Sequence, residues 1–237
     1  IQDKRDTMFT KINEGKYIKA RNVMDLALEK MPLDFFGYYS LMVPFVDGYY
    51  RINENKKAQT LSRSIGLKYS DRLNYFSSLD ADLQYALGEE IITEIERYRA
   101  LVEADLKHAE KADLSPTLNQ FMAASNPFKY LYGDYEYYTS LIEVAEGYFI
   151  IEATERAESL SSKIAENFQK RLQLYSQFSP KDQVLLEDRI KNEFLNYNYL
   201  LQQIKKYGNA SFFKNKEREY NESIKLFTDT LETEITE

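Results

Sequence analysis

The sequence contains no cysteine and no tryptophan, and His108 is its only histidine. Without cysteine, neither a disulfide nor a thiolate metal site can form. One histidine excludes a zinc site with two histidine ligands from a single chain. The chain also lacks an apolar run of the ~20 residues that a membrane-spanning helix needs. No signal peptide precedes the first helical pattern, so we expect the 237 residues to be part of a longer protein.

Positive charge is in deficit, with 31 Lys and Arg against 38 Asp and Glu and a net charge of -7. Binding to nucleic acid requires a basic face, so we predict no nucleic-acid partner. The eight glycines are dispersed and form no phosphate-binding loop. Hydrophobic residues make up 43% of the chain, which is typical of a folded globular protein. Tyrosine (20) and phenylalanine (14) are abundant, and the polar tip of tyrosine suits both a core and a groove.

The sequence repeats itself over a long stretch. When the chain is shifted by 99 residues, 38–102 aligns with 137–201 without a gap, and 18 of the 65 paired positions are identical. Most of the identical residues are apolar or aromatic and recur every three or four positions, as in an amphipathic helix. The duplication therefore indicates a packed helical unit rather than a catalytic site.

Helical spacing and turn residues divide the chain into five segments. We predict a helical hairpin over 1–34, a three-helix unit over 35–111, a connection over 112–133, a second three-helix unit over 134–207 and a terminal helix over 208–237. Within the connection, Ser115-Pro116 predicts the start of a short helix that reaches about Ala124. The helices of the first unit are expected over 37–51, 55–76 and 80–111, and those of the second over 134–151, 154–177 and 180–207. Pro44 predicts a kink in the first of them, and Asp80 and Ser179 are helix-capping residues.

The opening hairpin has the residue spacing of a tetratricopeptide (TPR) repeat. Small alanines allow its two helices to approach closely, and a proline ends the second helix. These positions are Gly15, Tyr17, Ala20, Ala27, Leu28 and Pro32. No strand pattern competes anywhere in the chain. We therefore predict an all-α fold, a single TPR-like helical-repeat domain (α-solenoid) over 1–237 with two duplicated three-helix units.

Residues 1–111 resemble the C-terminal region of a family of bacterial multi-pass membrane proteins of unknown function, related to transmembrane protein O-mannosyltransferases. The resemblance is carried by Ala20, Leu28, Met31-Pro32, Tyr39, Met42-Val43-Pro44, Tyr49-Tyr50, Ala58 and the run from Leu73 to Leu79. It implies a membrane-embedded N-terminal part with a glycosyltransferase-like fold and a helical tail outside the cytoplasm. Catalytic acidic residues of that family belong to the membrane part, so none is transferred to this sequence.

The candidate catalytic groups have simpler structural interpretations. Carboxylates dense enough for a general acid pair occur at Glu89, Glu90, Glu94 and Glu96. Their neighbours Arg97 and Arg99 favour a salt-bridged surface instead. Glu94 recurs as Glu193 beside the apolar stripe, which favours a role in holding helices together. His108 lies among charged residues and is expected on the surface. We predict no catalytic, cofactor-binding or metal-binding residue.

Adjacent aromatic residues open each duplicated unit. Neighbours on a helix point about 100° apart, so one of each pair can enter the core while the other reaches a groove. Tyr49 and Tyr148 continue the apolar stripe and are assigned to the core. Packing between helices is the leading interpretation for the other aromatics. The candidates for a groove that binds peptide or sugar are Tyr39, Tyr50, Tyr138 and Phe149.

These observations lead to a prediction of a non-catalytic interaction domain that binds a protein or peptide partner. From the resemblance, we expect it to be the tail of a glycosyltransferase-like membrane protein at the periplasmic face of the cytoplasmic membrane, next to its own membrane-embedded N-terminal part. The alternative is a module that binds glycan or acceptor and presents it to that enzyme. An independent hydrolase built on carboxylates is the least favoured hypothesis.

Overall fold

The computed structural model describes residues 2–30 and 38–227. These residues are almost entirely helical and include no strand, so the prediction of an all-α protein is confirmed. No helix within these ranges combines the length and apolar character needed to cross a membrane. The chain forms two compact units, 1–131 and 132–237. The predicted helix end at Met31-Pro32 and the last ten residues of the predicted terminal helix lie outside the described residues.

Unit 1 begins with the predicted hairpin, helices α1 (Gln2–Asn13) and α2 (Tyr17–Lys30). The turn between them contains Gly15, whose φ of 69° is accessible to glycine without steric cost. Both helices pack on α4 (Val43–Arg51). At that contact Gly48 has no side chain, and a Cβ there would lie 2.9 Å from the sulfur of Met24 and closer still to that of Met8. The glycine therefore allows the buried methionines of the hairpin to reach the α4 backbone.

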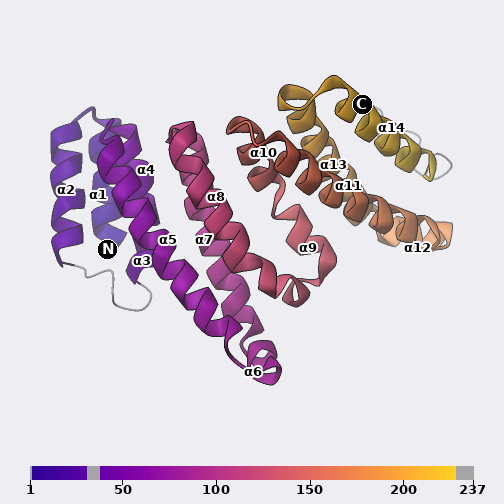
Figure 1. The fold of residues 1–237 in the computed structure, drawn as a ribbon, viewed down its shortest axis with the longest axis horizontal. Coiled ribbons are helices and arrows are strands. Elements are labelled where there is room, and N and C mark those ends of the chain that lie inside the picture. Colours follow the sequence, from indigo (N-terminus) through magenta and orange to yellow (C-terminus); the bar gives the residue numbers. More distant parts are fainter. Residues whose placement is uncertain (1, 31–37, 228–237) are drawn as a thin grey trace. The chain divides into compact units, whose positions relative to one another are not determined.

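The three long helices α5, α7 and α8 form the main body of unit 1. Besides the hairpin and α4, the elements of this unit are α3 (Tyr38–Leu41), α5 (Asn55–Ser77), α6 (Ala81–Ala86), α7 (Gly88–His108), α8 (Lys111–Ser125) and a 3-10 helix η1 (Asn126–Leu131). Figure 1 shows α5, α7 and α8 running side by side, with the short α6 at one end of the unit. Helix α4 packs on α5 and α7, and α8 packs on the same two helices.

Unit 2 repeats this plan. Its helices are α9 (Gly133–Thr139), α10 (Ile142–Ile150), α11 (Thr154–Ser176), α12 (Pro180–Leu185), α13 (Glu187–Tyr207) and α14 (Ala210–Lys225). Both ends of α4, α5, α6 and α7 recur 99 residues later as the ends of α10, α11, α12 and α13. Within unit 2, α10 packs on α11 and α13, and α14 packs on those two helices. The duplication predicted from the sequence is thus present in the helix boundaries.

The predicted helices are divided more finely than expected. The helix predicted over 37–51 is not kinked at Pro44 but interrupted at Met42, and Pro44 lies in the first turn of α4, where a missing N–H costs little. The helix predicted over 80–111 is interrupted at Leu87, whose ψ of 15° departs from helical values. Both interruptions recur in unit 2, at Leu141 and Leu186. Because the first recurs without a proline, tertiary packing rather than Pro44 determines it.

The short helix predicted within the connection over 112–133 is longer in the structure, where it forms α8, a full member of unit 1. This helix begins at Lys111 and continues through Pro116 to Ser125. A proline inside a helix removes one backbone hydrogen bond, which is why the sequence predicted a helix start there. The last helix of unit 2, α14, begins 99 residues after α8. The structural repeat therefore extends beyond the stretch in which the sequence repeats.

Stacked aromatic rings hold the three long helices of each unit together. In unit 1, Tyr69 of α5 stacks on Tyr98 of α7 at 5.1 Å, and Tyr98 meets Phe121 of α8 edge-on at 5.3 Å. In unit 2, Tyr197 takes the place of Tyr98, with rings at 5.4 and 5.2 Å from Phe168 and Tyr220. Such pairs contribute about 0.5–1.5 kcal/mol each beyond burial. They confirm α8 and α14 as equivalent helices.

The turn after α4, and its counterpart after α10, holds a residue in the left-handed backbone region, Asn53 and Glu152, each with a φ of 62°. This conformation costs an ordinary residue roughly 1–2 kcal/mol, but asparagine tolerates it better than glutamate does. We therefore expect Glu152→Gly to raise the free energy of unfolding of unit 2 by about 1 kcal/mol, as measured by urea denaturation. Asn53→Gly is the matched control and should give a smaller gain. A loss of stability in Glu152→Gly would contradict this account.

Candidate binding site

The structure corrects the sequence-based candidates for a groove. Tyr39, Tyr50 and Phe149 are buried, with exposed fractions of 4%, 5% and 5%. Only Tyr138 of the four candidates is partly exposed. Tyr49 and Tyr148 are buried as predicted. Both members of Tyr49-Tyr50 and of Tyr148-Phe149 enter the core, because α4 packs on α1, α2, α5 and α7, and α10 packs on α11 and α13.

Tyr39 is buried with a polar partner. Its hydroxyl donates a hydrogen bond to the carboxylate of Glu94 on α7, and its ring meets Tyr69 edge-on at 4.8 Å. Arg72 of α5 lies 3.4 Å from the same carboxylate and places its guanidinium 4.8 Å from the ring of Phe76. Burial raises the pKa of Glu94, and the hydrogen bond from Tyr39 opposes this effect. Glu94 therefore links α3, α5 and α7.

The same link exists in unit 2. Arg171 of α11 lies 3.3 Å from the buried carboxylate of Glu193 on α13, and its guanidinium lies over the ring of Tyr175 at 5.6 Å. Each of these residues is 99 positions after its counterpart in unit 1. A structural role explains why this glutamate is identical in the two copies. It does not point to acid–base catalysis.

A second buried carboxylate, Asp105 of α7, belongs to unit 1 alone. It accepts hydrogen bonds from Ser62 of α5 at 2.5 Å and from Tyr50 of α4 at 3.0 Å. Burial raises its pKa, while the hydrogen bonds from Ser62 and Tyr50 lower it. The ring of Tyr50 also stacks on His108 at 5.3 Å, and His108 Nε2 lies 3.0 Å from Asp47. The histidine is exposed, as predicted, but these contacts hold it in place.

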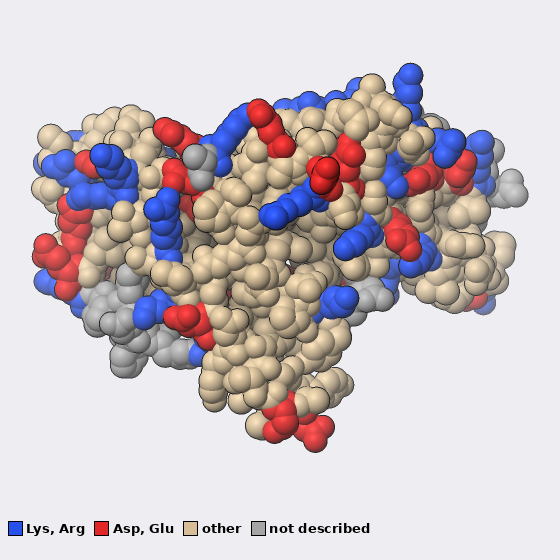
Figure 2. Space-filling model, in the orientation of Figure 1, with Lys and Arg blue, Asp and Glu red and all other residues tan. Residues whose placement is uncertain are grey.

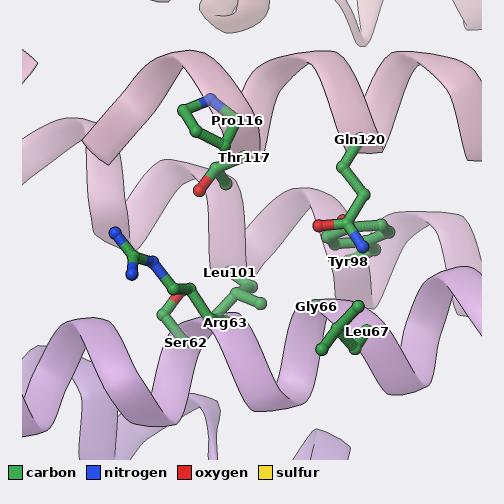
Figure 3. Close-up of a pocket in the computed structure, with 9 residues that line it drawn as sticks. All are labelled: Ser62, Arg63, Gly66, Leu67, Tyr98, Leu101, Pro116, Thr117 and Gln120. Carbon is green, nitrogen blue, oxygen red and sulfur yellow. The ribbon is translucent and has the colours of Figure 1, made fainter. Parts of the chain in front are cut away.

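An open pocket of about 420 Å³ lies beside the hydrogen bonds of Asp105, and residues of α5, α7 and α8 line it. Figure 3 shows the residues that line it projecting from these three helices. Gly66 contributes no side chain to the α5 side of the pocket, and a Cβ there would lie 3.4 Å from the hydroxyl of Tyr98. The lining is Ser62, Arg63, Gly66, Leu67, Tyr98, Leu101, Pro116, Thr117 and Gln120. Most of this surface is apolar.

Polar groups gather at the Arg63 end of the pocket. The Arg63 guanidinium lies 2.6 Å from a carboxylate oxygen of Asp113 on α8, and Gln59 donates a hydrogen bond of 2.6 Å to the other oxygen. Ser62, which bonds Asp105, lines the same end. Towards the other end lies Gln120, whose amide has no hydrogen-bond partner among the described residues. The pocket thus combines an apolar wall with a free amide and a charged rim.

The corresponding region of unit 2 has different side chains, which bond to one another. Ala165 and Glu219 take the places of Gly66 and Gln120. Glu219 of α14 accepts a hydrogen bond of 3.3 Å from Gln169 of α11 and pairs with Lys216 at 2.8 Å. These contacts join α11 to α14 where unit 1 leaves space between α5 and α8. The two copies therefore share a fold but differ at this place.

The sequence contained a signal for this pocket that the repeat alignment did not use. Gly66 is a glycine inside a long helical pattern, which is unfavourable unless packing or function requires it. The other half of the pocket comes from α8, where the sequence predicted only a short helix within a connection. Among the described residues, no group of three or more His, Asp or Glu side chains is arranged to hold a metal ion.

Comparison of the chain with protein-family models, with curated proteins and with solved structures gave no match.

Proposed function

We propose that this chain is a non-catalytic binding module whose unit 1 pocket receives an apolar side chain of a peptide partner. The observation that carries the proposal is the difference between the two copies. The two units have the same helices, but in unit 2 Glu219 bonds Gln169 and Lys216 in this region, whereas unit 1 has an open and mainly apolar pocket there. If α5 and α8 had only a structural role, we would expect side chains to fill the space between them, because close packing stabilises a fold.

The chemistry of the pocket favours a peptide. An apolar side chain can bury its surface against Leu67, Leu101 and the ring of Tyr98. The Gln120 amide can donate to a backbone carbonyl and accept from a backbone N–H, so it matches one peptide group of an extended segment. The paired charges of Arg63 and Asp113 lie at the rim, where they favour orientation more than affinity.

On the same proposal, the helices form a TPR-like arrangement. Two features support it: the α1–α2 hairpin with its glycine turn, and the tight turn that joins α4 to α5. The resemblance of residues 1–111 supports a place in the periplasm as the tail of a glycosyltransferase-like membrane protein. Several apolar segments of ~20 residues encoded before Ile1 would agree with that origin. A bright signal from a C-terminal reporter that fluoresces only in the cytoplasm would refute the location.

The pocket is tested by filling it. Gly66→Phe places a ring in the space between α5 and α8, and we expect it to weaken peptide binding at least about tenfold. Suitable ligands are selected from a displayed library of random 12-residue peptides and measured by fluorescence anisotropy. The matched control is Gly66→Ala, which copies Ala165 of unit 2 and adds a Cβ at ordinary contact distance. It should bind as the native chain does.

Two outcomes would contradict the proposal. Selected peptides that bind Gly66→Phe as tightly as the native chain would show that the pocket is not their site. If instead an array of oligosaccharides gave ligands whose binding is lost in Gly66→Phe and retained in Gly66→Ala, the alternative of a glycan-binding module would replace the peptide proposal. Circular dichroism and urea denaturation confirm that each variant is folded.

A further inference from the structure

The end of unit 1 around α6, which we name the α6 tip, exposes an unusual group of apolar side chains. They come from the end of α5, from α6 and from η1. Their exposed fractions are 61% for Tyr75, 48% for Leu83, 81% for Tyr85 and 53% for Tyr130. Single exposed apolar residues are common on protein surfaces, but a group of large ones indicates an interaction site. The α6 tip shares no residue with the pocket.

Hydrogen bonds hold the α6 tip in a fixed shape. The side-chain amide of Gln84 in α6 donates to the backbone carbonyls of Ser77 and Leu79 at 3.2 and 2.7 Å, which satisfies carbonyl groups at and beyond the end of α5. The hydroxyl of Tyr130 in η1 donates to the carbonyl oxygen of the same amide. The exposed rings are therefore presented by three connected elements, and a partner would not have to order them first.

Negative charge predominates at the α6 tip. Residues 73–96 contain no Lys or Arg, and the basic residue of the tip is the exposed Lys129, next to Tyr130 in η1. Asp82, Glu89 and Glu90 are exposed, and none of them forms an ion pair with another described residue. On the face in Figure 2, acidic side chains lie at the extremity of the projecting end of this unit, and the surface next to them is neutral. Unpaired negative charge beside apolar surface is complementary to a segment that is both basic and apolar.

The tip of unit 2 provides a comparison. Its α12 also exposes apolar residues, Val184 at 62% and Leu185 at 79%, and Gln183 makes the same two bonds to backbone carbonyls. Its charges differ, since Lys181 lies in α12 and Lys191 pairs with Glu187 at 2.8 Å. Exposed apolar tips are thus common to both copies, whereas the exposed carboxylates without an ion-pair partner were found at the tip of unit 1.

We infer that the α6 tip docks a protein segment that presents apolar side chains together with Lys or Arg. Apolar contacts with Leu83 and Tyr85 would supply affinity, and the unpaired carboxylates would select for basic residues. Leu83 and Tyr85 lie about 200° apart around α6, so a partner contacts one side of this short helix or wraps it. An anionic lipid surface would be repelled by the same carboxylates. This inference does not depend on the proposed function of the pocket.

The test uses a fluorescent 14-residue amphipathic peptide made of leucine and lysine, with fluorescence anisotropy as the readout. Leu83→Ser with Tyr85→Ser should weaken its binding at least about tenfold, and the two single variants report which side of α6 is used. Val184→Ser with Leu185→Ser removes equivalent surface from unit 2 and should change binding less than about twofold. Asp82→Lys with Glu89→Lys should weaken binding, and added salt should weaken binding to the native chain.

Other outcomes would overturn the inference. Equal losses in the two double-serine variants, or no loss in the α6 pair, would mean that the peptide does not recognise the α6 tip. Binding to phosphatidylcholine–phosphatidylserine vesicles that is lost in the α6 pair would show that the surface takes lipid instead. Gly66→Phe should leave peptide binding at the tip unchanged, so failure of the pocket proposal and failure of this inference give different results.

Discussion

Replacement of Tyr39 by alanine is expected to lower the free energy of unfolding of unit 1 by about 3–5 kcal/mol, as for truncation of a large core side chain. The change removes the edge contact with Tyr69 and the hydroxyl that donates to Glu94. It leaves a buried carboxylate with Arg72 but without its hydroxyl donor. Urea denaturation followed by circular dichroism measures the loss.

Two further variants separate the causes. Tyr39→Phe keeps the ring and removes only the hydroxyl, so we expect a loss of about 1–3 kcal/mol from the hydrogen bond that Glu94 no longer receives. Tyr138→Ala is the matched control in unit 2, where the equivalent side chain is partly exposed, and it should cost clearly less than Tyr39→Ala. If Tyr39→Ala were nearly neutral, the side chain would not be part of the core.

The second large effect is expected at Asp105. Asp105→Ala leaves the hydroxyls of Tyr50 and Ser62 without their acceptor in a buried place, and we expect a loss of about 2–4 kcal/mol. At the positions of Tyr50 and Asp105, unit 2 has the buried apolar residues Phe149 and Ile204. The double variant Tyr50→Phe with Asp105→Ile copies that pair. It should cost at least about 1 kcal/mol less than the sum of its two single variants, because the changed residues are in contact. Simple additivity would mean that the two side chains are not coupled.

The pH dependence of stability gives an independent test of Asp105. Burial raises the pKa of its carboxyl, despite hydrogen bonds from Ser62 and Tyr50 and the nearby charge of Arg63, and Asp113 acts in the same direction as burial. The folded state therefore favours the protonated form. Its stabilising contribution is complete below the unfolded pKa of about 4 and is lost as the pH rises through the folded pKa. As the pH rises above about 4, Asp105→Asn should lose less stability than the native chain. Glu94, whose pKa burial also raises, accounts for part of the remaining dependence.

Much of the fold followed from the sequence because the repeated apolar positions determine which residues are buried. The sequence correctly predicted helices α5 and α11, the helix caps at Asp80 and Ser179, and the burial of Tyr49 and Tyr148. Helix α8 was predicted too short because Pro116 indicated a helix start, although its loss of one hydrogen bond is offset by packing on α5 and α7. The sequence contained no sign that α8 is equivalent to α14, because no residue of 111–125 is identical to its counterpart in 210–224.

The candidate site was less predictable than the fold. Periodicity distinguishes core from surface on one helix, but it does not show how many neighbours cover that helix. Tyr39 and Tyr50 were therefore predicted as candidates for a groove. In the structure their hydroxyls donate hydrogen bonds to the buried carboxylates of Glu94 and Asp105. The pocket depends on residues of α5, α7 and α8 that are up to 58 positions apart, from Ser62 to Gln120. Only the tertiary arrangement brings them together.

The equal length of the two copies indicates which changes this chain has tolerated since it was duplicated. Of the 65 aligned positions, 47 now differ, yet no net insertion or deletion separates Val43–His108 from Ile142–Tyr207. The turns explain this, because each closes with backbone bonds that depend on residue count, such as Glu54 N–H to Tyr49 O and Ala153 N–H to Tyr148 O. One added residue there would rotate the next helix by about 100° and turn its apolar face away from the core. In this lineage the spacing of the turns has been inherited more strictly than the residues between them.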